Sequence, residues 1–270
     1  MFKLVAVDLD GTLLDDRKLI PSENIAAIRK IKDRGVKIVI ATGRPIAVIK
    51  KIIAQLGIDS DDDYCVALNG VLVQNLRSEE VICSSGFSGA LLKKLVSLLS
   101  QQYSLYIHTF SKTFGLVANK RNKYSDIECY GGVVQYREFD FSTVADSDEF
   151  YKCVLTGPKE MVDQLERNLD PVFRKLFSVV RTLPCILEFL PAGVSKGRGL
   201  SMLAGKIGIA PEEMIAFGDE HNDYEMLQAV GFPVAMGNAI EPVKKISKMV
   251  TTTNNEAGAA YALDKLFAGN

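Results

Sequence analysis

The stretch that decides the fold is LVAVDLDGT, at residues 4–12. Its four apolar residues are typical of a strand buried on both faces, as in a parallel sheet covered by helices. Residues two apart in an extended chain point to the same side, so Asp8 and Asp10 are expected to face one site at the carboxyl end of this strand. Two carboxylates this close repel each other. Taken alone, the pattern fits a cation site or an acid–nucleophile pair as well as it fits a solvated strand end, and the rest of the chain decides between them.

Further polar clusters occupy comparable positions along the chain. They are TGR at 42–44 after the apolar run 38–41, GDEHND at 218–223 after the apolar run 214–217, and GVSKG at 193–197 just before a helical pattern. Because each cluster follows an apolar strand or opens a helix, all of them can converge on one edge of one sheet. Such an edge is where open α/β sheets bind their ligands.

Strand and helix patterns alternate at both ends of the chain but not in its middle. In the first part, Ser22 is expected to cap a helix and Pro45 to lie in the first turn of the next one. Residues 71–82 are predicted to form a hairpin. The segments that follow mix extended stretches with amphipathic helices near 91–99 and 161–169, a pattern typical of an α+β domain.

The economical interpretation is a core built from both chain ends with a second domain inserted into it. We expect a doubly wound, Rossmann-like α/β core with a parallel sheet, formed by residues 1–83 and 191–270. The α+β insertion is predicted at residues 84–190. Small or turn-forming residues at both crossings suit hinges.

Composition narrows the classes of function. The 270 residues are 47% hydrophobic and 24% charged, and the net charge of −1 gives no broad basic surface for nucleic acid or an anionic membrane. The five cysteines form no Cys-x-x-Cys pair, which favours reduced thiols over a disulfide framework or a zinc site. No apolar run has the length of a membrane span, and the chain enters a strand at once, so no signal peptide is expected. We expect a cytoplasmic protein, with no nucleic acid, membrane or protein partner implied.

The motifs resemble those of the haloacid dehalogenase superfamily of phosphotransferases, and within it the Cof-type phosphatases. The resemblance rests on DLDGTLL at 8–14, ATGR at 41–44, NG at 69–70, GVSKG at 193–197 and GDEHND at 218–223. It implies that the insertion is a large cap of type IIB, placed between the second and third motifs. It also implies a Mg²⁺-dependent phosphatase for monoesters of small phosphorylated metabolites, with sugar phosphates as the leading class.

The resemblance implies a role for each residue of the site. Asp8 is the expected nucleophile, which forms an aspartyl-phosphate, and Asp10 is the expected general acid, whose proton the nearby Asp8 would help to retain. Asp219 is an expected Mg²⁺ ligand together with Asp8 and the backbone carbonyl of Asp10, and Asp223, four residues further on, is expected to support the metal. Contacts to the phosphate and the substrate are expected from Thr42, Gly43, Arg44, Lys196 and Asn222, with Asn69 in support.

Alternatives remain at several of these positions. Asp10 could be a plain metal ligand, the 219–223 segment an acidic helix start, and Arg44 a member of a structural ion pair. The same motifs also fit a phosphosugar mutase, or a regulator that binds a phosphorylated metabolite without turnover. The complete set of acidic residues and Lys196 favours an enzyme, because a pure binder needs neither an acid nor a nucleophile.

Overall fold

The computed structural model describes residues 1–268 apart from 104, 112, 125, 126, 128 and 131. The chain divides into two compact units. The core unit comprises Met1–Ser84 and Ser195–Asn270, and the inserted unit comprises Ser85–Val194. The boundaries thus lie at 84/85 and 194/195, against the predicted 83/84 and 190/191.

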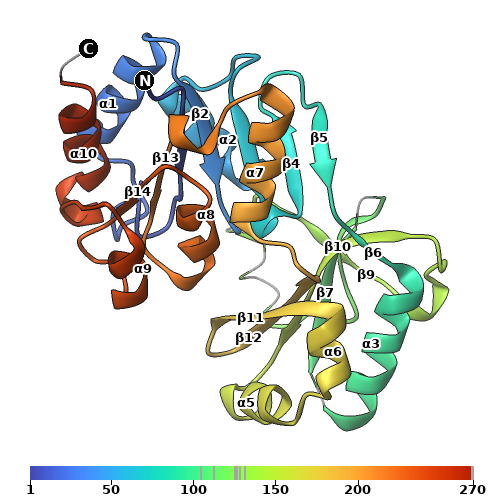
Figure 1. Ribbon diagram of the computed structural model, residues 1–270. Helices are drawn as coiled ribbons and strands as arrows, with labels where there is room; N and C mark the ends of the chain where they lie inside the picture. Colours follow the sequence, from blue (N-terminus) through green and yellow to red (C-terminus); the bar gives the residue numbers. More distant parts are fainter. Residues whose placement is uncertain (104, 112, 125–126, 128, 131, 269–270) are drawn as a thin grey trace. The chain divides into compact units, whose positions relative to one another are not determined.

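The core unit is built on an eight-stranded sheet (Figure 1). Its strands are β1 (Leu4–Val7), β2 (Lys37–Ala41), β3 (Tyr64–Ala67), β4 (Leu72–Asn75), β5 (Val81–Ser84), β13 (Met214–Gly218), β14 (Phe232–Ala235) and β15 (Met249–Val250). The spatial order is β15-β14-β13-β1-β2-β3-β4-β5. All neighbours from β15 to β3 pair in parallel, whereas β4 and β5 form the predicted antiparallel hairpin at one edge. The strand β13, from the second part of the chain, therefore pairs directly with β1.

Helices connect these parallel strands, as the alternating pattern predicts. The α-helices of the core unit are α1 (Ser22–Lys32), α2 (Ile46–Leu56), α7 (Lys196–Ile207), α8 (Tyr224–Gln228), α9 (Glu241–Ile246) and α10 (Gly258–Leu266). The 3₁₀ turns are η1 (Leu68–Gly70), η3 (Pro211–Glu213), η4 (His221–Asp223) and η5 (Asn254–Glu256). Helix α1 packs against α10, and α7 packs against α8.

The helix starts differ in detail from the prediction. Helix α1 begins at Ser22 itself, with Pro21 in the capping position and no side-chain cap, so the prediction of Ser22 as the cap is wrong. Pro45 likewise precedes α2 instead of lying within it, and Gly57 closes that helix in the left-handed conformation with φ 70°. Proline fixes its own φ and has no N–H to satisfy, so it serves at a helix start without a capping side chain.

The inserted unit has its own sheet and its own hydrophobic core. Its sheet follows the order β11-β12-β10-β7-β8-β9, with β6 paired to β10. The strands are β6 (Phe87–Ser88), β7 (Tyr106–Ser111), β8 (Gly115–Ala118), β9 (Tyr136–Glu138), β10 (Glu149–Thr156), β11 (Phe177–Leu183) and β12 (Ile186–Pro191), and the helical segments are α3 (Gly89–Gln102), η2 (Phe141–Thr143), α5 (Lys159–Asn168) and α6 (Pro171–Leu176). Leu95, Leu155, Leu165 and Phe189 belong to one buried cluster that joins helices to strands. The expected α/β core with an α+β insertion is confirmed.

Burial in the core unit explains where its polar side chains gather. Every residue of β1, β3 and β13 is buried, so helices cover both faces of these strands and leave their ends as the place for a ligand. Among the helices that the structure describes, none is both long and apolar enough to cross a membrane.

Two adjacent residues of α7 allow a test of this packing. Leu203 is fully buried, whereas Met202 is 43% exposed. We expect Leu203→Ala to lower the free energy of unfolding by about 2–5 kcal/mol, because it leaves a cavity beneath the helix. Met202→Ala should change it by only about 0.5 kcal/mol. Denaturant unfolding followed by circular dichroism measures both, and equal losses would contradict the packing described.

Candidate active site

Polar loops meet at the carboxyl ends of adjacent strands of the core unit. Val7, the last residue of β1, pairs in register with Ile40 of β2 and with Phe217 of β13. Asp8 follows β1 directly, Thr42 follows β2 and Asp219 follows β13. The predicted convergence of these loops on one sheet edge is therefore present in the structure.

A buried lysine joins two of the acidic side chains. Lys196 is the first residue of α7, and the Ser195 hydroxyl caps the helix by accepting the Arg198 N–H. The Lys196 Nζ donates to Asp8 Oδ1 and to Asp223 Oδ1, each at 2.7 Å. Burial alone would lower the pKa of Lys196, but the charges of Asp223 and Asp8 outweigh it and raise that pKa. The ammonium therefore stays charged although its side chain has no exposed surface.

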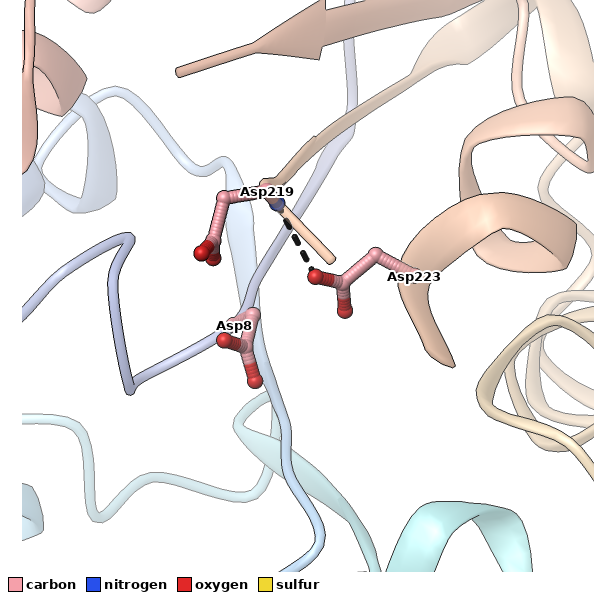
Figure 2. Close-up of side chains that lie close together, drawn as sticks. All are labelled: Asp8, Asp219 and Asp223. Atoms are coloured by element: carbon pink, nitrogen blue, oxygen red, sulfur yellow. Dashed lines mark hydrogen bonds between the residues drawn. The ribbon is translucent and has the colours of Figure 1, made fainter. Parts of the chain in front are cut away.

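Three carboxylates gather around this lysine. One oxygen from each of Asp8, Asp219 and Asp223 lies within 4.8 Å of the other two. Figure 2 shows the three side chains close together. Asp223 Oδ2 accepts the backbone N–H groups of Asp219 at 3.0 Å and Glu220 at 3.1 Å. Although four residues separate them, Asp219 and Asp223 do not lie on one helix, because Asp219 follows a strand and Asp223 ends η4. Asp223 instead fixes the backbone that carries Asp219.

The Asp-Gly-Thr segment after β1 also holds Asp219. The Thr12 hydroxyl donates to Asp219 Oδ1 at 2.7 Å. Gly11 has φ 82°, and a Cβ there would lie only 2.3 Å from Asp219 Oδ2, so this position admits no side chain. Thr12 had no predicted role, although a hydroxyl two residues after Asp10 was a usable signal.

The carboxylates of this cluster repel one another without enough positive charge to balance them. Burial raises the pKa of Asp8 to about 8, which Lys196 opposes and the charges of Asp223 and Asp219 reinforce. Burial likewise raises the pKa of Asp219 to about 7; the Thr12 hydrogen bond opposes this rise, and the charge of Asp223 adds to it. A bound cation would relieve the repulsion. Since Lys196 and Thr12 engage only Oδ1 of Asp8 and Asp219, the Oδ2 atoms suit a hard, oxygen-preferring ion such as Mg²⁺.

Asp10 lies outside this cluster, in contrast to the predicted pair with Asp8. The Arg44 guanidinium binds it through Nε to Oδ2 at 2.8 Å and Nη2 to Oδ1 at 2.6 Å. The Lys18 Nζ donates to Asp10 Oδ1 at 2.8 Å. Burial raises the pKa of Asp10, but the hydrogen bonds from Arg44 and Lys18 outweigh it and leave that pKa below its ordinary value. The expectation that Asp8 helps Asp10 to retain a proton is therefore wrong for this conformation.

The sequence predicted a role for one of the two partners of Asp10, Arg44, but not for the other, Lys18. The structure gives Arg44 the ion pair that the sequence left open as the alternative to phosphate binding. Lys18 had no predicted role. It reaches Asp10 from a turn in which its own backbone is left-handed, with φ 63°, and no local pattern indicates this contact.

A third group of predicted residues joins the loops after β2 and β3 to Asn222 in η4. Thr42 Oγ1 accepts the Arg44 N–H at 3.1 Å, and the Thr42 carbonyl accepts the Asn69 N–H at 3.0 Å. The Asn222 Nδ2 donates to Asn69 Oδ1 at 3.2 Å. A Cβ on Gly43 would meet the same Asn69 amide at 3.2 Å. Every predicted site residue thus lies in the core unit. The residues form three groups, which are Asp8, Lys196, Asp219 and Asp223; Asp10 and Arg44; and Thr42, Gly43, Asn69 and Asn222. Only the first group is an acidic cluster.

Comparison with known proteins places this geometry in a family. The chain matches the model for haloacid dehalogenase-like hydrolases over residues 5–263. It is 30% identical to the 5-amino-6-(5-phospho-D-ribitylamino)uracil phosphatase YcsE of Bacillus subtilis, over 97% of this chain and 94% of that protein. The solved structure of a haloacid dehalogenase-like hydrolase from Bacteroides thetaiotaomicron is similar to this one, with a TM-score of 0.89 and 31% sequence identity. The match covers 99% of this chain and 100% of that chain. The subclass IIB sugar phosphatase BT4131 gives a TM-score of 0.80 and 26% identity, over 98% and 99% of the two chains.

The raised pKa values predict that the metal-free protein loses stability as the pH rises. Asp8 and Asp219 have pKa values of about 8 and about 7 in the fold, against 3.8 for an ordinary aspartate. A carboxyl whose pKa is raised in the fold contributes to the free energy of unfolding while it is protonated. This contribution falls as the pH rises from about 4 to about 8. In excess chelator we expect a lower unfolding midpoint at about pH 8.5 than at about pH 6. Mg²⁺ should restore more stability at the higher pH, because it binds ionised carboxylates.

Asp219→Asn provides the matched variant for this measurement. It removes one of the two titrating groups, so its stability in chelator should depend less steeply on pH than that of the wild type. Asp264→Asn, at an exposed ion pair with Lys30, should retain the wild-type slope. A wild-type midpoint that does not fall between the two pH values in chelator, or an unchanged slope in Asp219→Asn, would contradict the assignment.

Proposed function

The chain is a phosphatase of the haloacid dehalogenase-like hydrolase family, and we propose that it hydrolyses phosphate monoesters of small metabolites with Mg²⁺ through an aspartyl-phosphate on Asp8. The observation that carries this proposal is the buried Lys196, held at 2.7 Å from both Asp8 and Asp223 with Asp219 beside them. Phosphoryl transfer needs an aligned nucleophile and positive charge to balance the transferred group, and this cluster offers both.

The first half of the proposed reaction forms a bond between Asp8 and phosphorus. A carboxylate oxygen of Asp8 attacks the phosphorus atom of the ester. The bond between phosphorus and the leaving oxygen breaks, and its electron pair stays on that oxygen, which takes a proton from Asp10 to leave as an alcohol. The product is a mixed anhydride between Asp8 and phosphate. The retained negative charge of the phosphoryl group lies next to Lys196.

The second half regenerates the enzyme. Asp10, now a carboxylate, accepts a proton from water while the water oxygen attacks phosphorus, and the bond from phosphorus to the Asp8 oxygen breaks. Inorganic phosphate leaves, and Asp8 recovers its carboxylate. For the first half, Asp10 has to leave Arg44 and Lys18 and take up a proton, because the conformation described here favours its ionised form.

The remaining polar groups are assigned to the phosphoryl oxygens and to the metal. We assign Thr42 and the backbone of Gly43 to hydrogen bonds with the phosphoryl group, and Asn222 to the substrate. Asp8 and Asp219 would hold Mg²⁺ with the Asp10 carbonyl, and Asp223 supports them by fixing the Asp219 backbone. When bound, the ion supplies positive charge that offsets the charge of the phosphoryl group during transfer.

The proposed substrate class is sugar phosphates. BT4131 is a sugar phosphatase, and YcsE acts on a phosphorylated ribityl chain, so both relatives support a phosphate ester on a polyhydroxy carbon chain. We propose that the inserted unit acts as the cap that selects this leaving group, since every residue assigned to the phosphoryl group belongs to the core unit. The five cysteines form no Cys-x-x-Cys pair in the sequence, and this supports a cytoplasmic location.

Metal dependence is the first test of this proposal. Release of phosphate from sugar phosphates and from a small aryl phosphate should stop in excess chelator and return when Mg²⁺ is added. Ca²⁺ should support turnover poorly, because its larger and looser coordination misplaces the nucleophile relative to the phosphoryl group. Full activity in excess chelator would refute the metal requirement.

The covalent intermediate is the second test. Asp8→Asn should lower kcat by about a thousandfold or more while the protein stays folded, because an amide cannot replace the attacking carboxylate. Asp264→Asn, a surface aspartate, should keep wild-type kcat. Acid-quenched wild-type enzyme should carry phosphate on Asp8, detected by mass spectrometry of its peptides. Phosphate found on a different residue, or turnover retained in Asp8→Asn, would exclude Asp8 as the nucleophile.

A further inference from the structure

The η1 turn after β3 has an unusual backbone. Leu68, Asn69 and Gly70 are consecutive and left-handed, with φ of 51°, 56° and 98°. This conformation costs free energy at residues other than glycine, and least at asparagine and aspartate. Such strain persists only where the surroundings fix it, and it gathers at functional sites. The contacts of this turn therefore indicate what it holds in place.

The backbone of the turn is tied to the loop after β2. The Asn69 N–H donates to the Thr42 carbonyl at 3.0 Å, and the Leu68 N–H donates to the Arg44 carbonyl at 3.4 Å. These bonds reach both sides of Gly43. The turn thus fixes the path of the loop that we assign to the phosphoryl oxygens.

The Asn69 side chain reaches a second loop. Its Oδ1 accepts a hydrogen bond from Asn222 Nδ2, which lies 153 positions further along the chain. The same amide lies over Gly43, where a Cβ would approach it to 3.2 Å. Asn69 is only 7% exposed, so one largely buried amide connects the loop after β2 with the loop that carries Asp219 and Asp223.

The last residue of the turn contacts the start of α7. A Cβ on Gly70 would lie 2.1 Å from the Ser195 carbonyl oxygen and 3.2 Å from the Lys196 N. Gly70 therefore packs directly against the backbone that carries the Lys196 ammonium. The three residues of the turn together contact the loop after β2, the loop that carries Asp219 and Asp223, and the start of α7.

We propose that Asn69 is a positioning residue for phosphoryl transfer. Its amide holds the Asn222 loop against Thr42 and Gly43, and the left-handed turn that it occupies holds the start of α7. This role rests on the proposed phosphatase function. Asn69 acts through these loops and not through its own contact with the leaving group, so its loss should slow the reaction of all substrates by a similar factor.

Asn69→Gly tests the amide without disturbing the backbone, because glycine adopts the left-handed conformation readily. We expect kcat to fall by about tenfold or more, since a displacement near 1 Å can cost up to about a hundredfold. KM should change by only about twofold, and the loss should be similar for a sugar phosphate and for a small aryl phosphate. Glu79→Gly is the matched control: Glu79 also has a left-handed backbone, with φ 57°, but it lies in the exposed hairpin between β4 and β5 and should keep wild-type kcat.

The Asn222 side of the bond gives a second measurement. Asn222→Ala breaks the same hydrogen bond without altering the turn, so the double variant with Asn69→Gly should lose less activity than the product of the two single losses. Thermal unfolding of all variants controls for folding. Three results would overturn the positioning role: a loss in the double variant equal to the product of the two single losses, an unchanged kcat in Asn69→Gly, or a loss confined to the sugar phosphate. If the wild type and Glu79→Gly release no phosphate from any ester, it is the proposed function that fails instead.

Discussion

The buried ammonium of Lys196 is the interaction on which the rest of the site depends. It lies between two carboxylates that have almost no exposed surface, and removal of such a partner leaves uncompensated buried charge, at a typical cost of about 3–5 kcal/mol. Asp8, Asp219 and Asp223 bring three negative charges when ionised, and Lys196 returns one positive charge. The difference of two charges is what a divalent cation would balance, and it adds to the burial that raises the pKa values of Asp8 and Asp219.

The sheet supplies the geometry that this ion pair requires. Strand β1 pairs in parallel with both β2 and β13, so Asp8 and Asp219 leave neighbouring strands at the same level. Close approach also needs glycine at two points. A Cβ on Gly11 would contact the Asp219 carboxylate, and one on Gly218 would lie 2.5 Å from the Asp223 Cβ. The loop that carries Asp219 and Asp223 can therefore pack onto the loop after β1 only because both positions lack side chains.

These features differ in how far the sequence could predict them. Apolar runs followed by polar residues predicted both the strands and the placement of Asp8, Thr42 and Asp219 at one sheet edge, because the carboxyl ends of parallel strands share an edge. The partners of Asp10 could not be predicted in the same way. The Arg44 guanidinium reaches it across 34 positions, and Lys18 reaches it from a turn with an irregular backbone. Such pairings depend on side-chain directions set by tertiary packing, which spacing in the sequence does not contain.

Burial divides the site into a fixed part and a movable part. The Lys196 and Asp8 side chains are 0% and 8% exposed, whereas Asp10 and Lys18 are 40% and 58% exposed. An exposed ion pair contributes only about 0–1 kcal/mol, so Asp10 can leave Lys18 at little cost, while the Lys196 contacts cannot be broken cheaply. The Arg44 backbone is held on both sides, through its N–H by Thr42 and through its carbonyl by Leu68, which leaves its side chain as the part able to move. Release of Asp10 in the proposed proton transfer therefore requires rearrangement of the Arg44 and Lys18 side chains, which are 19% and 58% exposed. The buried contact of Lys196 with Asp8 need not be broken for it.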